Sequence, residues 1–216
     1  MDRRDEVSGG GAPWLVRFDH PAQPANPYPE RVPRGIVVKY TSALRLLRLR
    51  DAPKMRDGED ADYIVSAPFT VVWQADGIEP RELRVPAGLI TDLVSVPRPF
   101  RWIVSRAGPY LEAAILHDYL YIAWQDVPGR GVRDADRAFA DAIMLAAMAE
   151  ARVGAMLRWV IHASVRLFGG RAYARPNPDR YADLGAPEIV AQSAFVVPDD
   201  RGPRPDARDG IARRAG

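Results

Sequence analysis

The sequence predicts an α+β protein with an antiparallel β-rich N-terminal half, followed by three helices and flanked by disordered termini. Two observations predict this fold class. Short runs of β-branched and aromatic residues, separated by turn residues, fill the first half. Longer apolar stretches with helical periodicity, bounded by Gly and Pro, fill the second half. The 20 prolines crowd the two ends of the chain, which favours extended backbone there.

Composition divides the 216 residues into three parts. Residues 1–34 are predicted to form a Pro-rich, partly disordered lead-in, residues 35–185 a single α+β domain, and residues 186–216 an irregular to disordered tail. We expect residues 1 to about 12 and 199–216 to be mobile and removable. Their composition cannot bury enough apolar area to offset an ordering entropy of about 1–2 kcal/mol per residue.

Four segments of the first half are predicted to be strands, because they are rich in Val, Ile, Thr and aromatic residues. They are residues 35–40, 63–66, 69–73 and 81–85. The sequence Ala75-Asp76-Gly77 predicts a turn between the last two. Residues 43–50 fit either a strand or a short helix, and both stay open.

Three helices are predicted, over residues 110–124, 134–152 and 154–168. Pro109 suits the start of the first helix, and Asp134 can cap the second. The third helix has one apolar face and is expected to stop at a pair of glycines. The apolar face consists of Met156, Trp159, Val160, Ala163 and Leu167, and the glycines are Gly169 and Gly170.

Composition also bounds the function. The chain has no cysteine, so it has no disulfides, thiolate metal ligands or cysteine nucleophile. A net charge of +2, with arginines and aspartates interleaved, gives no specific signal for nucleic-acid binding. We find neither a signal peptide nor a transmembrane segment, which needs roughly 20 apolar residues, and therefore expect a soluble protein.

The residues best suited to chemistry lie on the first helix, at His117, Asp118 and Tyr121. Residues four apart share a helix face, so His117 and Tyr121 lie one above the other. Asp118 points about 100° away and can address a cation. The next helix packs antiparallel after a short loop and brings Asp134 and Asp136 near. We therefore expect His117 to hydrogen-bond to Asp136, which leaves the other ring nitrogen free to take a proton from water.

A structural interpretation of the same residues stays open. A His-Asp pair flanked by tyrosines is often only a polar network that ties helices to a sheet, and this competes with a catalytic or metal-binding role. The other two histidines, His20 and His162, are interpreted as structural or incidental, because their neighbours are Pro-rich and apolar respectively.

A polar turn within residues 85–97 is assigned to the same candidate site. Its Thr91, Asp92 and Ser95 follow a predicted strand, and we expect Asp92 to converge with the His117 helix. The oxygens of these side chains and of Asp118 are suitable ligands for calcium or another divalent metal. The alternative is a turn whose side chains only cap its own backbone.

Four segments, taken in order, resemble a family of bacterial and phage proteins known as domain of unknown function 1353. They are residues 85–97 (VPAGLITDLVSVP), 116–121 (LHDYLY), 135–139 (ADRAF) and 163–169 (ASVRLFG). The resemblance spans about residues 63–173. It implies a phage or prophage origin, hence a place in the bacterial cytoplasm or a virion with other virion proteins as partners, and brings no settled activity.

His117-Asp118 with Tyr121, followed on an antiparallel helix by Asp136-Arg137-Ala138, is also similar to the helix pair of secreted phospholipases A2. That resemblance implies His117 as the general base for water, Asp118 as a calcium ligand, and Tyr121 and Asp136 as the orienting residues. The chain departs from that family because it has no disulfides and no glycine-rich calcium loop before the helix. The polar turn at residues 91–95 would have to replace that loop.

Two functions remain after these observations. The first is a phage-related hydrolase that uses His117 as base, with a divalent metal on Asp118 and Asp92, and acts on ester or amide bonds of lipid or cell-wall material. The second is a non-catalytic virion or tail-assembly protein whose polar cluster is structural. A metal or a cleft at His117 favours the enzyme, and a buried, fully hydrogen-bonded cluster favours the structural protein.

Overall fold

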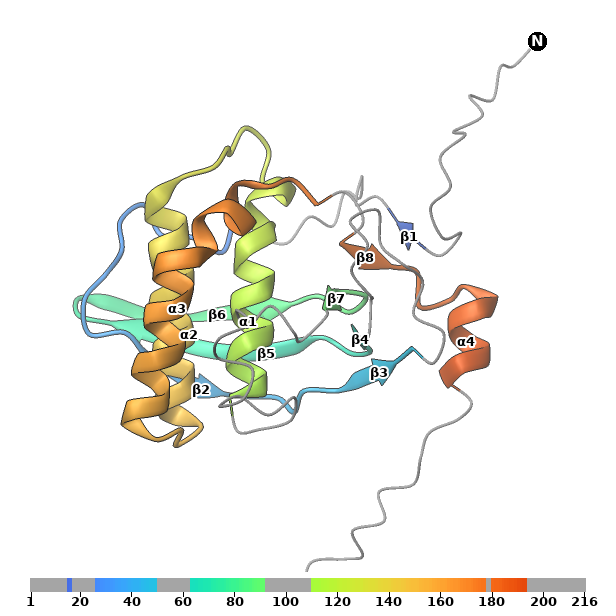
Figure 1. The fold of residues 1–216 in the computed structure, drawn as a ribbon, viewed down its shortest axis with the longest axis horizontal. Coiled ribbons are helices and arrows are strands. Elements are labelled where there is room, and N and C mark those ends of the chain that lie inside the picture. The colour runs from blue at the N-terminus through green and yellow to red at the C-terminus, as the bar shows by residue number, and fades with distance from the viewer. Residues whose placement is uncertain (1–14, 17–25, 50–62, 92–109, 178–179, 194–216) are drawn as a thin grey trace, which may run out of the picture.

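The computed structural model describes residues 15–16, 26–49, 63–91, 110–177 and 180–193 (Figure 1). The predictions made for Asp92, Ser95, Pro109, His20 and the two chain ends lie outside these residues. The strands are β1 Leu15–Val16, β2 Val37–Tyr40, β3 Leu46–Arg48, β4 Tyr63–Val65, β5 Phe69–Ala75, β6 Ile78–Val85, β7 Ile90–Thr91 and β8 Tyr181–Ala182. The helices are α1 Leu111–Ile122, a 3₁₀ helix at Ala123–Asp126, α2 Asp134–Glu150, α3 Ala155–Ala174 and α4 Pro187–Ser193.

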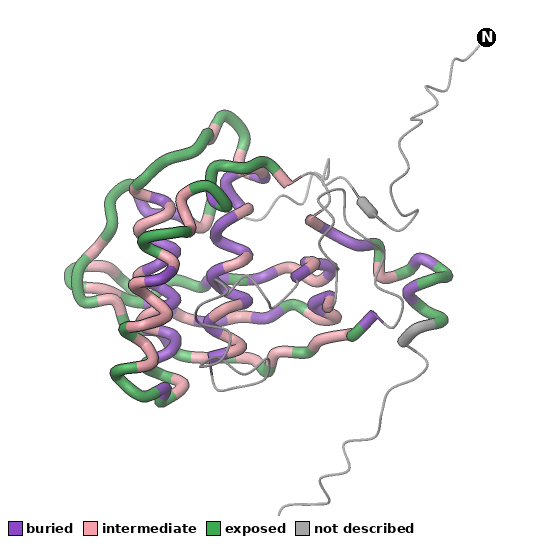
Figure 2. The backbone as a smooth tube through the Cα atoms, in the orientation of Figure 1, coloured by how far each residue is buried: buried purple, intermediate pink, exposed green. Residues whose placement is uncertain are grey.

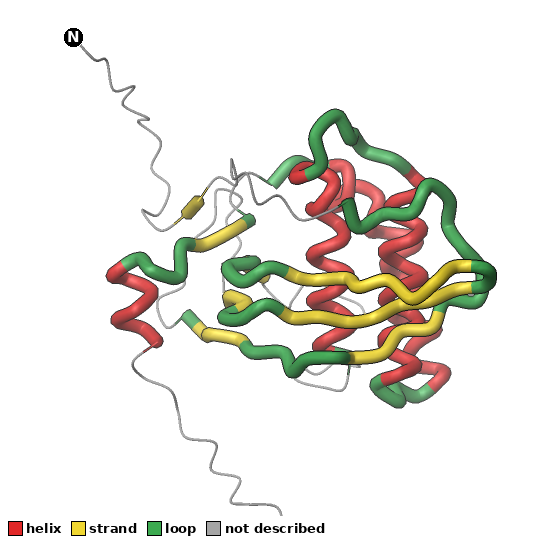
Figure 3. The backbone as a smooth tube through the Cα atoms, turned by 180° about the vertical axis from the view of Figure 1, so that it is seen from behind, coloured by secondary structure: helices red, strands yellow, loops and turns green. Residues whose placement is uncertain are grey.

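The predicted α+β class is confirmed, with antiparallel strands first and helices after them. Strands β2, β5 and β6 form one antiparallel sheet in the order β2-β5-β6, and β3, β4 and β7 form a second in the order β3-β4-β7. A third, two-stranded sheet joins β1 to β8. Helices α1, α2 and α3 lie together on one face of the β2-β5-β6 sheet, as the views from the two sides show (Figures 1 and 3).

The core lies between that sheet and helices α1 and α2. Alternate residues of β5, namely Phe69, Val71 and Trp73, are buried, as the period of two in a strand requires. Trp73 meets Phe139 of α2 edge to face, with ring centroids 5.0 Å apart. Figure 2 shows the buried residues on the sides of the helices and strands that meet. The sheet therefore fixes the positions of α1 and α2, which carry the candidate site.

The strand predictions hold with small shifts of boundary. All four predicted strands are present, as β2, β4, β5 and β6, and the open segment 43–50 contains the short strand β3. The predicted turn at Ala75-Asp76-Gly77 joins β5 to β6, and Gly77 adopts a φ of 69°. Glycine suits this position because residues with a Cβ rarely adopt a positive φ.

Two helix details differ from prediction. Arg133, without a side-chain cap, precedes α2, so Asp134 is the first helical residue rather than its cap. Helix α3 continues through Gly169 and Gly170 to Ala174, because the glycines serve close packing rather than termination. A Cβ at Gly169 would lie 2.5 Å from the Tyr121 hydroxyl oxygen, so only glycine lets α3 approach α1 this closely.

Both flanking parts contribute to the fold. Tyr28, from the predicted lead-in, is buried and its hydroxyl donates to the Leu120 carbonyl of α1. The predicted irregular tail contains helix α4, whose Ile189 packs against Leu49 and Ile64. Apolar burial thus orders segments whose proline content predicted irregular structure. Within the described ranges, no helix is long and apolar enough to cross a membrane.

Candidate functional site

Helices α1, α2 and α3 converge on the carboxylate of Asp141, which is 1% exposed. Its Oδ1 lies 2.9 Å from Nε2 of His117 and accepts a 2.8 Å hydrogen bond from the Tyr121 hydroxyl. Its Oδ2 accepts a 3.3 Å hydrogen bond from Nη1 of Arg166. We call these four residues, His117, Tyr121, Asp141 and Arg166, the Asp141 cluster.

Helix geometry explains how the cluster forms. His117 and Tyr121 are one turn apart on α1, and their ring centroids lie 3.9 Å apart, as the spacing of four predicts. Asp141 lies near the middle of α2, which packs against α1. Gly169 admits the Tyr121 hydroxyl beside α3, and this places Arg166 within reach of Asp141.

The hydrogen bonds keep Asp141 charged. Burial raises the pKa of Asp141, but hydrogen bonds and charge from His117, with further bonds from Tyr121 and Arg166, lower it by more, so the net pKa lies below its ordinary value. An ionised carboxylate can only accept a hydrogen bond, so when His117 is neutral its Nε2 carries the proton and donates it. The lone pair of the neutral ring is then on Nδ1, which has no hydrogen-bond partner among the residues described.

The charge of Asp141 also affects the pKa of two further groups, Tyr121 and His162. Burial raises the pKa of Tyr121 well above its usual range, and the charge of Asp141 adds to this effect, so Tyr121 stays a neutral donor. Burial lowers the pKa of His162, while Asp141 opposes the shift. Arg137 also acts on the pKa of Tyr121 by its charge, and its Nε is buried without a hydrogen-bond partner in the described part of the chain.

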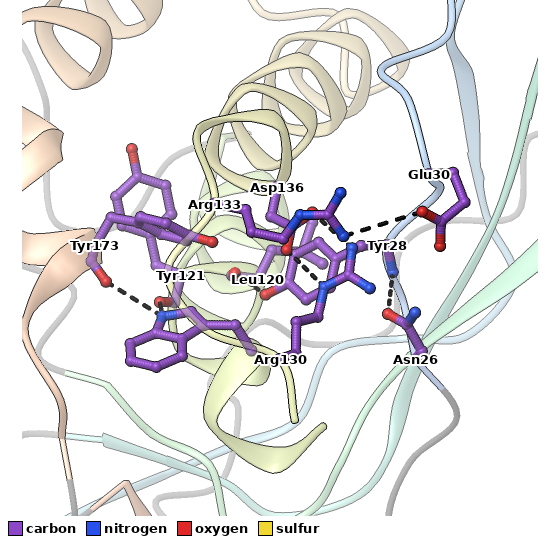
Figure 4. Close-up of polar contacts among 10 residues, drawn as sticks. Asn26, Tyr28, Glu30, Leu120, Tyr121, Arg130, Arg133, Asp136 and Tyr173 are labelled. Atoms are coloured by element: carbon purple, nitrogen blue, oxygen red, sulfur yellow. Dashed lines mark hydrogen bonds and ion pairs between the residues drawn. The ribbon is translucent and has the colours of Figure 1, made fainter. Parts of the chain in front are cut away.

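The predicted hydrogen bond between His117 and Asp136 is wrong. Asp136 accepts instead from Arg130, at 2.6 Å from Nε and 2.7 Å from Nη2 (Figure 4). Arg130 also lies over the ring of Tyr28, 4.9 Å from its centroid. Asp136 belongs to the first turn of α2, next to the preceding loop. His117 lies in the middle of α1, so its partner on the adjacent helix comes from the middle of α2.

Thr91, the one residue of the predicted Thr91, Asp92 and Ser95 group that the structure describes, contacts α1. The Thr91 hydroxyl donates a 2.7 Å hydrogen bond to Oδ2 of Asp118, which joins the end of β7 to the residue next to His117. Asp92 and Ser95 fall outside the described residues, so this contact is the observed part of that prediction. Asp134 is exposed at the start of α2.

The described residues do not supply a complete metal site. Among them, no three His, Asp or Glu side chains gather as metal ligands. Asp118 and Thr91 offer hard oxygen atoms of the kind calcium prefers, but calcium takes six to eight such ligands.

Sequence reasoning missed Asp141 and Arg166 and set His162 aside. Asp141 is seven residues, about two helical turns, beyond Asp134 and so lies on the same face of the predicted second helix. Because that helix is predicted to run antiparallel to the first, Asp141 could have been considered as a partner of His117. Arg166 and His162 share a helix face at a spacing of four, which was available from the sequence as well.

The site is thus a buried His-Asp-Tyr constellation on helices α1 and α2 of an α+β domain, with Arg166 added from α3. A family model described as "Protein of unknown function (DUF1353)" matches residues 65–165, which include His117, Tyr121 and Asp141. This match supports the predicted family resemblance. No curated protein and no solved structure gives a significant match.

Proposed function

We propose that this chain is a hydrolase in which His117 is the general base and Asp141 the residue that orients it. The observation that supports this most is the pairing of the His117 Nε2 with a buried, ionised carboxylate while Nδ1 keeps its lone pair. Asp141 takes the orienting role that the phospholipase resemblance implied for Asp136. Ester or amide bonds of lipid or cell-wall material are the proposed substrates.

In the proposed reaction, Nδ1 of His117 takes a proton from water while the water oxygen attacks the substrate carbonyl. Asp141 stabilises the imidazolium that forms, through the Nε2–H hydrogen bond. The proton then passes to the leaving alcohol or amine, so the products are an acid and that alcohol or amine. Arg137 and Arg166 add positive charge near the cluster, which is favourable for a developing oxyanion.

The burial of the cluster favours a second candidate, a non-catalytic virion or tail-assembly protein. His117 is only 6% exposed, and Asp141 has donors on both carboxylate oxygens. A polar network of this kind fixes how three helices pack. In this role, removal of His117 affects stability and nothing else.

The two candidates separate in one experiment. Wild type, His117→Ala and Asp141→Asn are assayed on a soluble p-nitrophenyl ester, dispersed phospholipid and purified peptidoglycan, with and without calcium. For a hydrolase, both variants lose activity, and His117→Ala loses about 10²–10⁴-fold because the positioned base is gone.

Asp126→Asn is the matched control. Asp126 is another buried aspartate. It accepts hydrogen bonds from Tyr181 and Arg180 and, among the residues described, from no histidine, so its variant is expected to lose stability and keep activity. Wild-type protein without hydrolysis on any of the three substrates, together with a melting temperature lowered by several degrees in His117→Ala, would establish the structural role instead.

A further inference from the structure

Helix α3 is apolar on two sides, and the described part of the chain covers one of them. Its inner side packs on the core through Leu157, Ile161 and Val165. Its outer side carries Met156, Trp159 and Leu167, which are 80%, 69% and 76% exposed. In Figure 2 most of α3 is exposed or half-buried. The predicted apolar face of this helix therefore exists, but it points away from the core.

The exposed apolar residues form a stripe that runs through the half-buried Ala163. Met156, Trp159, Ala163 and Leu167 are spaced by three, four and four residues, which aligns them along one side of a helix. Phe168, 60% exposed, widens the stripe at its C-terminal end. Helix α3 is α-helical over 20 residues, or about 30 Å, and large apolar side chains gathered this way mark an interaction surface.

The charged residues of α3 and its flanks indicate which kind of partner this surface would bind. Every charged residue from Ala151 to Arg175 is an arginine, at positions 152, 158, 166, 171 and 175, and no Asp or Glu occurs among them. A second copy of the chain, docked by the same face under two-fold symmetry, would bring like arginines together. An anionic partner is favoured instead.

We propose that the outer side of α3 docks on an anionic lipid bilayer. A helix that combines an exposed Trp, Phe, Leu and Met with arginines and no acidic residue has the composition of helices that lie in the plane of a membrane interface. Trp159 and Leu167 enter the boundary between headgroups and acyl chains, and exposed Arg171 meets lipid phosphates. The apolar stripe contains no residue of the Asp141 cluster, although Arg166 precedes Leu167 on α3, and docking needs no hydrolysis.

Flotation of the full chain with lipid vesicles tests the proposal. Wild type is expected to float with phosphatidylcholine vesicles that contain phosphatidylglycerol, and less with phosphatidylcholine alone or at high salt, because arginine attraction to lipid is screened. Trp159→Ser and Leu167→Ser are each expected to lower the partition coefficient about tenfold, since each removes a large apolar side chain from the interface.

Three controls make the result specific. Val132→Ser removes an apolar side chain that is 48% exposed outside α3, and it should leave binding unchanged. Trp159→Phe should keep binding, because it keeps an apolar ring, but it should lose the quenching of tryptophan fluorescence by brominated lipid. His117→Ala should bind like wild type, so loss of catalysis and loss of docking are distinguishable.

Three outcomes would overturn the proposal. One is a wild-type protein that does not float with anionic vesicles. Another is flotation that Trp159→Ser and Leu167→Ser leave unchanged. The third is a wild-type dimer in sedimentation-velocity runs that the same two variants dissociate, which would assign the face to a second copy of the chain.

Discussion

Helix α2 carries two equally buried aspartates whose partners differ in kind. Asp136 and Asp141 are each 1% exposed and five residues apart. Asp136 is held by two hydrogen bonds from Arg130, whereas Asp141 is shared among His117, Tyr121 and the half-exposed Arg166. Arginine keeps its proton in proteins, so the Asp136 pair is fixed in charge, while histidine can exchange a proton near neutral pH.

The contrast between Asp136 and Asp141 indicates which buried carboxylate could take part in a reaction. Burial of a carboxylate alone does not distinguish a functional site from a structural ion pair. What distinguishes Asp141 is a partner that can gain and lose a proton and that keeps one nitrogen without a hydrogen bond in the described structure. The Asp136 pair, by contrast, stabilises the junction of the preceding loop with α2.

The largest expected effect comes from removing Arg130. Arg130→Ala leaves Asp136 buried without its cation, and breaking a buried pair in this way costs about 3–5 kcal/mol of unfolding free energy. Arg166→Ala is the matched test on the other cluster. It should cost less than about 1 kcal/mol, because Arg166 is 44% exposed and Asp141 keeps two donors.

Urea denaturation measures both free energies. The double variant Arg130→Met/Asp136→Leu should recover much of the loss, since apolar replacement of a buried ion pair is often neutral. Equal losses in Arg130→Ala and Arg166→Ala would contradict the contrast between a fixed and a shared carboxylate.

A smaller effect is expected from Gly169→Ala. The new Cβ would lie 2.5 Å from the Tyr121 hydroxyl, so Tyr121 or α3 must move, at a cost of about 1–3 kcal/mol for overpacking. Gly131→Ala meets no atom within 4 Å and should leave the midpoint of thermal unfolding nearly unchanged. If Gly169→Ala melts like wild type, the glycine does not control the approach of α3 to the Asp141 cluster.

The smallest expected effect is on pH dependence, because burial and hydrogen bonding act on the pKa of Asp141 in opposite directions. The net pKa is lowered by folding, so this carboxylate contributes stability that is complete above its ordinary pKa of 3.8. That contribution is lost as pH falls through the folded pKa. Urea titrations of wild type and Asp141→Asn below pH 5 should show a shallower loss in the variant, and parallel curves would argue against it.

Local spacing predicted much of this molecule from the sequence. The stacking of His117 on Tyr121 follows from a separation of four residues, and the strands follow from runs of β-branched and aromatic residues. Neither prediction depends on how far one helix is shifted along its axis relative to the helix packed against it. The choice between Asp136 and Asp141 does depend on it, and proximity to the loop favoured the wrong residue.

Helix α3 shows a second limit of sequence reasoning. Its apolar face was evident from periodicity, but periodicity does not say whether such a face meets the core or solvent. Because a parallel series at Leu157, Ile161 and Val165 packs inward, the more conspicuous series with Met156 and Trp159 is left outside. The pair Gly169-Gly170 led to a wrong prediction of the end of α3, because glycine can either end a helix or permit close contact between helices.

The pairing of β1 with β8 has a consequence for synthesis of the chain. Leu15 lies opposite Ala182 in this sheet, and Leu89 bridges to Tyr181, so segments far apart in the sequence must meet before this sheet is complete. Contacts this distant in sequence form slowly and cannot form while the C-terminal strand is still in the ribosome. The β1-β8 sheet therefore waits for translation of Tyr181–Ala182, whereas the β2-β5-β6 and β3-β4-β7 sheets are built from residues 37–91 and can pair earlier.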